Sequence, residues 1–396
     1  MLTGLGLRQR LAAFYFVYFA AFGAMLPYWS LYLRSLGLNA SEIGWLLAIP
    51  LATRLLAPSA WGWLADHWGR PMAVVRIGSL GALTTFAVIY ALPGPFAALA
   101  LAIAFFSLFS SATLPQFEAA TLAHLADQSS RYGKIRWWGS LGFILATSAG
   151  GVLVQTLGAV HLPALLLTLF AGVWLNSLLV PEPPRRETAR DGGSLLDILS
   201  QRSVIALLII AVLIQASHGP YYAFFSVQLT DLHYSATTIG ALWNTGVGAE
   251  IGIFFIVPKL LRRHSAQILM MFTLALTTLR WLMIGWFADN GYWLLTAQTL
   301  HGFSFGMHHA VSMTLLHSYF SGPHQSRGQA LYSSLSTGVG GALASVAAGY
   351  SWSHWGPTGS YAWAAGLSGI GLIVAWRGLR VSPPASAALR PPDSSC

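Results

Sequence analysis

Charged residues and cysteine are scarce in this chain. Only 8% of its 396 residues are Asp, Glu, Lys or Arg, whereas 55% are hydrophobic and the mean hydropathy is +0.60. Soluble domains carry charge on roughly a quarter of their residues, so this composition excludes a sizeable soluble domain. The single cysteine, Cys396, excludes an intrachain disulfide and a thiolate metal site. The abundant apolar surface requires a lipid bilayer as its solvent.

Long hydrophobic runs of the length that crosses a bilayer recur along the sequence. A membrane-spanning helix needs about 20 apolar residues, and hydropathy predicts twelve such helices. The first run, Leu11 to Leu33, is too long for the apolar region of a signal peptide, and no small-residue cleavage site follows it. The predicted helices cover residues 11–33, 43–65, 72–92, 96–123, 137–157, 161–180, 203–227, 239–258, 267–287, 292–317, 329–350 and 360–376.

Basic residues are concentrated in alternate connections between these helices. With a cytoplasmic N-terminus, 18 of the 21 Lys and Arg residues fall on the inner side and only Arg34 falls on the outer side. Arg54 and Arg280 are left within predicted helices. Because this bias follows the positive-inside rule, we expect a multi-pass bacterial inner-membrane protein with both termini in the cytoplasm.

A polar stretch divides the chain into two similar halves. The segment 39–44 (NASEIG) matches 235–240 (SATTIG), and each begins with a helix N-cap candidate, Asn39 or Ser235. Internal repeats of this kind are typical of transporters. The expected organisation is a six-helix bundle at 1–180, a cytoplasmic linker at 181–202, a second six-helix bundle at 203–380 and a cytoplasmic tail at 381–396.

The connection between the second and third predicted helices carries a specific motif. Gly62, Leu64, Asp66, Gly69 and Arg70 fall in an order that resembles the G-x-L-a-D-r-x-G-r signature of the major facilitator superfamily. The glycines permit a tight turn and close approach of helices, and the aspartate can cap a helix or pair with a basic group. A generic charged turn is the alternative. The resemblance implies an all-α membrane protein with two pseudo-symmetric six-helix bundles, whose rocking exposes a substrate site to each side in turn.

A closer resemblance extends over nearly the whole chain. In several short sequence segments the chain resembles the phenylpropionate/proton symporter family of the major facilitator superfamily. This resemblance implies uptake of an aromatic carboxylate together with a proton. Relatives within such families differ in substrate while keeping the same frame. The residues that carry the resemblance are 26–30 (LPYWS), 132–140 (YGKIRWWGS), 218–222 (HGPYY), 280–281 (RW), 300–301 (LH) and a short Ser-Cys ending.

Ionisable residues are predicted inside the membrane. Arg54 lies near the middle of the second predicted helix, where a charge costs about 2.5–3.5 kcal/mol on insertion scales, so it should face a cavity or a partner. Glu250 falls opposite it when the two halves are aligned. Arginine can grip a substrate carboxylate with two parallel hydrogen bonds, and a buried glutamate can carry a proton. A permanent ion pair between Arg54 and Glu250 is the structural alternative.

Histidines gather in the tenth predicted helix. His301, Ser304 and His308 recur at helical spacing on one face, and histidine both hydrogen-bonds substrates and titrates near neutral pH. With Glu250 and Arg280, His301 resembles the proton-coupling cluster of lactose permease. In that cluster a glutamate follows the histidine by three residues, whereas this chain has Ser304, which moves the expected proton site to Glu250.

Neither metal nor nucleotide chemistry is expected. His308 and His309 are adjacent and point about 100° apart on a helix, so they cannot chelate one ion together. Packing is as good an explanation for both as function. Since no glycine-rich loop of the Walker type is present, the proton gradient is the expected energy source and no cofactor is implied.

Glu118 follows Pro115 in the fourth predicted helix and resembles an acidic position of the same family. With Arg136 or Lys134 as partner it would be structural; otherwise it would serve gating or proton exit.

Aromatic residues crowd the first and seventh predicted helices. Pro27 and Pro220 are expected to interrupt these helices at matching places, next to Tyr28 and Tyr221. Broken helices near repeat interfaces often bind substrate, so an aromatic-lined cavity is predicted there. Packing and anchoring at the membrane interface are the alternatives.

The combined pattern predicts a secondary transporter without enzymatic activity. The hypothesis is proton-coupled import of a small aromatic carboxylate such as 3-phenylpropionate; a proton-coupled sugar or nucleoside symporter and a drug efflux permease are the alternatives. Its partners would be substrate, protons and lipid, with no nucleic acid and no obligatory protein. The expected substrate contacts are Arg54, Tyr28, His218, Tyr221, Tyr222 and His301. The expected proton-coupling residues are Glu250, Arg280, His301, His309 and Glu118.

Overall fold

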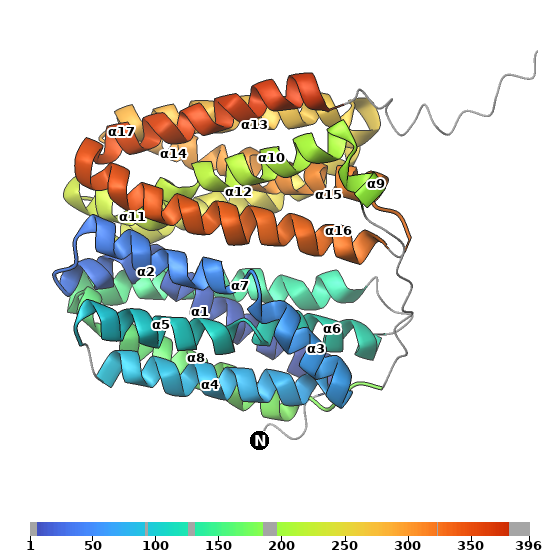
Figure 1. The fold of residues 1–396 in the computed structure, drawn as a ribbon. Helices are drawn as coiled ribbons and strands as arrows, with labels where there is room; N and C mark the ends of the chain where they lie inside the picture. Colours follow the sequence, from blue (N-terminus) through green and yellow to red (C-terminus); the bar gives the residue numbers. More distant parts are fainter. Residues whose placement is uncertain (1–5, 92–93, 126–130, 185–195, 323, 380–396) are drawn as a thin grey trace, which may run out of the picture. The chain divides into compact units, whose positions relative to one another are not determined.

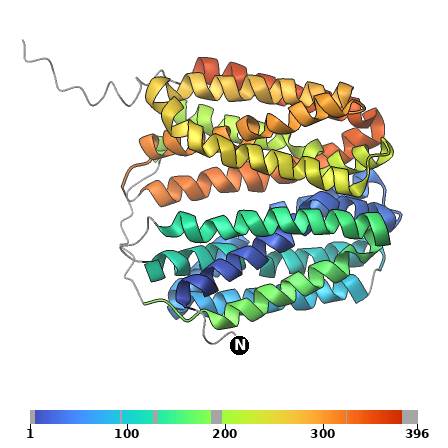
Figure 2. The ribbon, with the colours of Figure 1, turned by 180° about the vertical axis from the view of Figure 1, so that it is seen from behind.

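A computed structural model describes residues 6–91, 94–125, 131–184, 196–322 and 324–379, which form helices joined by short turns (Figures 1 and 2). Ten helices in this part of the chain are long and apolar enough to cross a membrane. One of them, His324–Gly378, is kinked at Gly356, and residues 291–319 add another helical segment of spanning length. The described residues therefore contain the twelve spanning segments that the sequence predicts. Half of the predicted linker, at 185–195, and the predicted tail lie outside the described residues.

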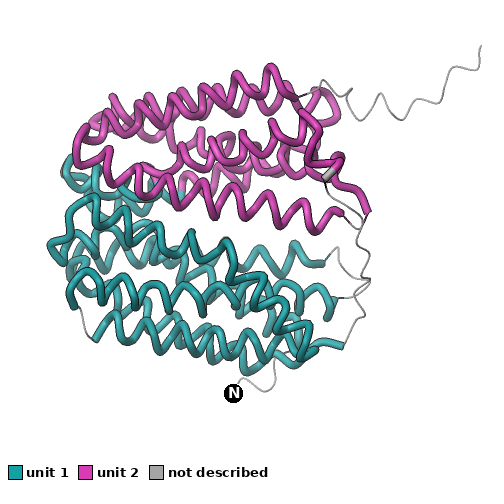
Figure 3. Tube along the Cα trace, in the orientation of Figure 1, with its two compact units in different colours: residues 1–189, 222–244 teal, residues 190–221, 245–396 magenta. Residues whose placement is uncertain are grey.

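The described residues group into two compact units (Figure 3). Unit 1 comprises residues 1–189 and 222–244, and unit 2 comprises residues 190–221 and 245–396. Residues 222–244 belong to the second half by sequence but pack with the first six predicted helices. The division into two sequence repeats stays a prediction.

Unit 1 is built around the contact between its first helix and two later ones. Helix α1 packs along α7 and α8, and α4 lies beside α5 and α8 (Figures 1 and 2). A Cβ atom at Gly23 of α1 would lie 2.8 Å from the Cα atom of Phe143, so glycine permits the close approach of α7. The helices are α1 (Leu7–Ser35), α2 (Ala40–Thr53), α3 (Ala57–Trp68), α4 (Pro71–Ala91), α5 (Phe96–Ser110), α6 (Thr113–Leu125), α7 (Tyr132–Leu157), the 3-10 turn η3 (Ala159–His161) and α8 (Leu162–Leu179).

The segment 222–244 is fixed to the rest of unit 1 by polar contacts. Arg34 Nη1 lies 2.6 Å from Asp231 Oδ1. The Ala236 amide donates to Gln155 Oε1 at 2.7 Å, and Asn244 Nδ2 donates to the Ile144 carbonyl at 3.1 Å. These bonds join the segment to both α1 and α7.

Unit 2 is centred on α17, which packs against α10 and α13. Its apolar core includes Leu207, Met270, Leu274, Met307 and Val311, all completely buried. Helices α11 (Gly219–Asp231) and α12 (Ala236–Arg263) contribute residues to both units. The other helices are α9 (Leu196–Leu199), α10 (Arg202–Ser217), α13 (Ala266–Phe287), α14 (Gly291–Thr299), η4 (Gly302–Met307), α15 (His308–Tyr319), α16 (His324–Ser333), η5 (Ser334–Gly340) and α17 (Gly341–Gly378).

The predicted helix caps are confirmed. Asn39 Oδ1 accepts a hydrogen bond from the Glu42 amide at 3.0 Å, and Ser235 Oγ accepts one from the Thr238 amide at 3.1 Å. Each bond satisfies a backbone donor in the first helical turn. Gly69 ends α3 with φ of +64°, a conformation that glycine adopts without strain. The glycine of the motif therefore stops α3 before Pro71 begins α4.

Several helices predicted as continuous are interrupted. The second ends at Thr53 and resumes at Ala57, the fourth is interrupted at 111–112, and the tenth and eleventh pass through η4 and η5. The seventh breaks at His218, directly before Gly219 and Pro220, so that predicted interruption is confirmed. The matching prediction for Pro27 is wrong, because α1 continues through it.

Candidate functional site

Two π-helical turns in unit 2 border a cavity of about 250 Å³. The turns are η4 and η5, and each contributes lining residues. Such turns insert an extra residue into a helix and are frequent at functional sites. Ring-bearing side chains that line the cavity are His218, Phe305, His308, His309 and Tyr332. Polar side chains that line it are Gln215, Ser304, Gln329, Ser333, Ser336 and Thr337.

Close packing between α12 and η4 sets the position of Glu250. A Cβ atom at Gly302 would lie 2.6 Å from the Ala249 carbonyl oxygen. At Gly306 it would lie 3.0 Å from Cγ of Glu250 and 2.6 Å from Cγ2 of Ile253. The half-buried Glu250 side chain therefore lies against the π-helical turn that also carries Ser304.

Arg280 lies behind η4 as a completely buried cation. Its Nε donates to the Ala297 carbonyl at 3.0 Å, and its Nη1 donates to Ser304 Oγ at 3.2 Å. The guanidinium carbon lies 4.2 Å from the ring centre of Tyr221 and 4.5 Å from that of Trp281. A desolvated cation gains about 2 kcal/mol or more over such rings. Ser304, which stands where the lactose permease cluster has a glutamate, is thus a direct partner of Arg280.

The two rings over Arg280 are themselves held by hydrogen bonds. Tyr221 donates from its hydroxyl to Gln298 Oε1 at 2.9 Å, and Trp281 donates from Nε1 to Ser217 Oγ at 3.1 Å. Gln298 is completely buried and was not among the site residues expected from the sequence. An amide within an apolar helix was the one signal for it.

Two histidines present defined ring nitrogens at the cavity. His218 Nδ1 lies 2.8 Å from the Ile214 carbonyl. Because a carbonyl oxygen only accepts, Nδ1 carries the hydrogen, and in the neutral ring Nε2 is an acceptor. His308 Nε2 lies 3.3 Å from Ser312 Oγ and 3.5 Å from the Tyr332 hydroxyl. His218 Nε2 can therefore accept a hydrogen bond from a polar solute, whereas His308 Nε2 already lies against two hydroxyls.

The other two histidines stack on Phe305. The His301 ring centre lies 5.6 Å from that of Phe305 at 18°, and the His309 ring centre lies 6.5 Å away at 9°. His309 is exposed and lines the cavity. His301 is buried beside Tyr221, at 5.7 Å between ring centres, and is not one of the described lining residues. The predicted shared face of His301, Ser304 and His308 is therefore only partly presented to the cavity.

Glu118 forms a polar cluster in unit 1. Tyr132 donates to Glu118 Oε1 at 3.1 Å, and Arg136 Nε lies 3.8 Å from the same oxygen. The Arg136 guanidinium also covers the Phe19 ring at 3.8 Å. The predicted partner Arg136 is thus found, and the contacts favour the structural interpretation of Glu118.

Arg54 lies at the break between α2 and α3. Arg54 lies midway along the spanning segment Ala40–Trp68, as predicted, but the helix is not continuous there, since α2 ends at Thr53 and Arg54 is its exposed C-cap residue. It makes no ion pair or side-chain hydrogen bond with a described residue. Arg54 belongs to unit 1 and Glu250 to unit 2, so their pairing stays a prediction.

Tyr28 and Tyr222 occupy packed positions in unit 1. The completely buried Tyr28 donates from its hydroxyl to the Thr147 carbonyl at 2.9 Å. Tyr222 stacks on Trp243, with ring centres 6.3 Å apart at 23°. Neither is a described lining residue of the unit 2 cavity. Their contact with substrate stays a prediction.

The motif residues lie at the α3–α4 turn. Gly62 is close to Gln116, with 3.5 Å between a Cβ at Gly62 and Nε2. Asp66 and Arg70 are exposed and have no side-chain partner among the described residues. Within the same described part, no three His, Cys, Asp or Glu side chains converge as a metal site.

Most of the chain is similar in sequence to known proteins. Residues 8–363 match the profile of the MFS_1 like family. A probable 3-phenylpropionic acid transporter from Escherichia coli strain K12 is 30% identical over 351 residues, covering 87% of this chain and 91% of that protein. A maltose permease from Geobacillus stearothermophilus is 29% identical over 350 residues, covering 86% and 87%.

Solved structures match the fold. A crystal structure of the nucleoside transporter NupG has a TM-score of 0.83 at 17% identity, covering 94% of this chain and 98% of that one. The POT family transporter PepTSo has a TM-score of 0.70 at 14% identity, covering 93% of this chain and 96% of that one. These likenesses confirm the predicted fold class of two six-helix bundles.

Proposed function

Because this chain belongs to the MFS_1 like family, we propose that it imports a small aromatic carboxylate such as 3-phenylpropionate together with a proton. The chain is a multi-pass membrane protein and a secondary transporter of the major facilitator type, not an enzyme. We place it in a bacterial inner membrane with both termini in the cytoplasm. In this proposal the proton gradient supplies the energy, and transport needs no cofactor and no partner protein.

The observation that carries the proposal is the unit 2 cavity. Its volume of about 250 Å³ is below the range of roughly 300–1,000 Å³ that holds drug-sized ligands. Imidazole, phenyl and phenol rings contribute to its walls, and aromatic faces attract another ring in offset or edge-on geometry. A solute with one ring suits these walls. The substrate in the name of the Escherichia coli relative has the same character.

Arg54 is proposed to bind the substrate carboxylate. Its guanidinium is exposed and makes no ion pair with a described residue, whereas Arg280 already donates two hydrogen bonds and is covered by two rings. The planar fork of arginine matches two carboxylate oxygens at once. Arg280 is then proposed to act in coupling rather than as the substrate clamp.

Glu250 is proposed to carry the coupled proton. Its side chain lies against Gly306 of η4, the turn whose Ser304 binds Arg280. A change in charge at Glu250 would therefore act on the same turn that lines the cavity. His301 and His309, stacked on Phe305 of that turn, are proposed to assist the transfer.

Uptake into proteoliposomes tests the proposal. Labelled 3-phenylpropionate should accumulate when the lumen is alkaline, and a protonophore should abolish the accumulation. Cinnamate should compete, whereas maltose and uridine should not. Uptake that ignores the pH gradient would contradict proton coupling, and uptake unaffected by every aromatic acid would contradict the substrate class.

A hydroxyl-rich solute is the second candidate. The cavity presents the amides of Gln215 and Gln329 and the hydroxyls of Ser333, Ser336 and Thr337, groups that suit a sugar or nucleoside. The maltose permease relative points the same way. Saturable uptake of maltose or uridine, insensitive to aromatic acids, would replace the first proposal by this one.

A further inference from the structure

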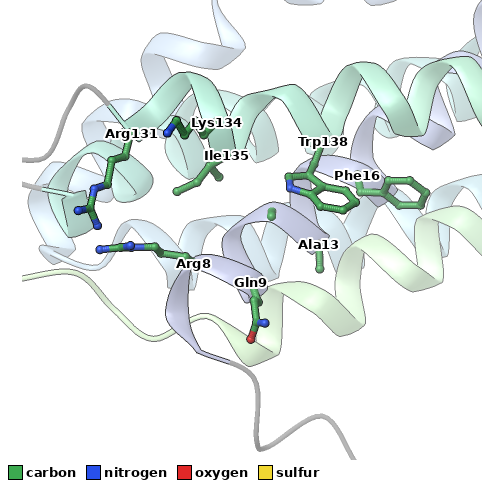
Figure 4. Close-up of a pocket in the computed structure, with 9 residues that line it drawn as sticks. Arg8, Gln9, Ala13, Phe16, Arg131, Lys134, Ile135 and Trp138 are labelled. Carbon is green, nitrogen blue, oxygen red and sulfur yellow. The ribbon is translucent and has the colours of Figure 1, made fainter.

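A second cavity, of about 760 Å³, lies in unit 1 between the first turns of α1 and α7. Figure 4 shows the guanidinium groups of Arg8 and Arg131 at one end with Lys134 near them, and the rings of Phe16 and Trp138 at the other end. The remaining described lining residues are Gln9, Ala12, Ala13 and Ile135. The transport mechanism proposed above uses none of these residues.

The electrostatics of this cavity favour an anion. Three of its described lining residues are cationic and none carries a carboxylate. Helices α1 and α7 both begin there, and a helix N-terminus adds a partial positive charge of about half a unit.

The lengths of the helices allow the cationic end to lie outside the hydrocarbon layer. At 1.5 Å per residue the 29 residues of α1 extend about 43 Å and the 26 residues of α7 about 39 Å. Both exceed the roughly 30 Å thickness of the hydrocarbon core, so each helix can span the core with its first turn among the lipid headgroups. Trp138, a residue type typical of the membrane interface, is 46% exposed at the other end of the cavity.

We propose that this cavity binds an anionic phospholipid through its phosphodiester headgroup, with phosphatidylglycerol as the type. Arg8, Arg131 and Lys134 hold the phosphate oxygens, for which the arginine fork is well shaped. Phe16 and Trp138 cover the first carbons of an acyl chain. Basic pockets between membrane helices bind such headgroups. The apolar end distinguishes a lipid from a free phosphate ion.

Native mass spectrometry of the full chain tests the proposal, with phosphatidylglycerol, phosphatidylcholine and inorganic phosphate as probes. The wild type should retain phosphatidylglycerol in preference to phosphatidylcholine, and millimolar phosphate should not displace it. Removing three charges in R8Q/R131Q/K134Q should lower the affinity on the order of a hundredfold, at about fivefold per charge. The control K259Q/R262Q/R263Q removes the same residue types from the end of α12 and should leave the affinity unchanged.

A second measurement covers the case in which the triple variant is poorly folded. Phosphatidylglycerol with brominated acyl chains should quench tryptophan fluorescence more strongly in the wild type than in Trp138→Phe, since bromine quenches only at contact. The proposal would be overturned if the control triple variant lost phosphatidylglycerol as the test variant does, or if the wild type retained phosphatidylcholine equally well. It would also be overturned if phosphate displaced the lipid, or if Trp138→Phe were quenched as strongly as the wild type. None of these readouts requires transport, so the result is independent of the proposed substrate.

Discussion

Replacing Arg280 with lysine would keep the buried positive charge of unit 2 but remove the planar guanidinium. Arg280 donates to the Ala297 carbonyl at 3.0 Å and to Ser304 Oγ at 3.2 Å, and lies over Tyr221 and Trp281. A hydrogen bond from a charged group contributes about 1.5–3 kcal/mol, and a desolvated cation–π contact about 2 kcal/mol. A lysine at this position can form one of the two hydrogen bonds and keep part of the cation–π contact with the rings, so the other hydrogen bond and the rest of the contact are lost. We therefore expect a loss of about 3 kcal/mol.

Thermal unfolding of the purified protein measures this loss. For a unit of this size 1 kcal/mol corresponds to about 2–4 °C, so the apparent midpoint of Arg280→Lys should fall by about 6–12 °C. The matched control is Arg377→Lys, an exposed arginine of the same unit that lies 5.6 Å from the Trp376 ring. Its effect should stay within about 0.5 kcal/mol. Equal midpoints for the two variants would refute the assignment of Arg280 as a cation held by its cage.

Three further substitutions test other parts of the proposal. Arg54→Lys keeps the charge but loses the two-pronged grip, so the Kd for 3-phenylpropionate should rise about tenfold; an unchanged Kd would remove Arg54 from the binding site. Glu250→Gln should abolish accumulation driven by a proton gradient yet spare counterflow exchange, whereas equal loss of both would count against a proton role. Gly306→Ala pushes a methyl group against Ile253 and should cost about 1–3 kcal/mol in thermal unfolding, while Gly248→Ala, with open space around it, should not.

Hydropathy predicted the spans well because an apolar run of fixed length has few alternatives in lipid. The interruptions were not predictable in the same way. The residues after Thr53 are Arg54, Leu55 and Leu56, which favour helix by intrinsic propensity, yet the helix breaks there. The signal for the break lies just beyond them, because Pro58 in the first turn of α3 has no N–H to donate to the Arg54 carbonyl and favours the start of a new helix. Likewise, Gly219 and Pro220 mark the break at His218 directly in the sequence.

The candidate site was predictable where a residue is costly in lipid. Arg280, His218 and His309 were selected because charge or imidazole within an apolar run needs a reason, and the structure places all three in unit 2 at or beside the cavity. Gln329 and Thr337 line the cavity too, but single amides and hydroxyls occur in many membrane helices. Which of these side chains face the cavity depends on the π-helical turn η5. The extra residue of that turn cannot be recognised from the spacing of hydrophobic residues in the sequence.

The π-helical turn η4 inserts one extra residue into the tenth spanning segment and so changes the helical register of that segment. It holds one residue more per turn than an α-helix, and one residue corresponds to about 100° around the axis. If that surplus residue moved along the segment, the residues that it passed would turn by about this angle, while the chain beyond its new position would keep its orientation. His308 would then swing away from Tyr332 without any helix unwinding. The walls of the cavity can thus be exchanged by a screw-like step inside one helix.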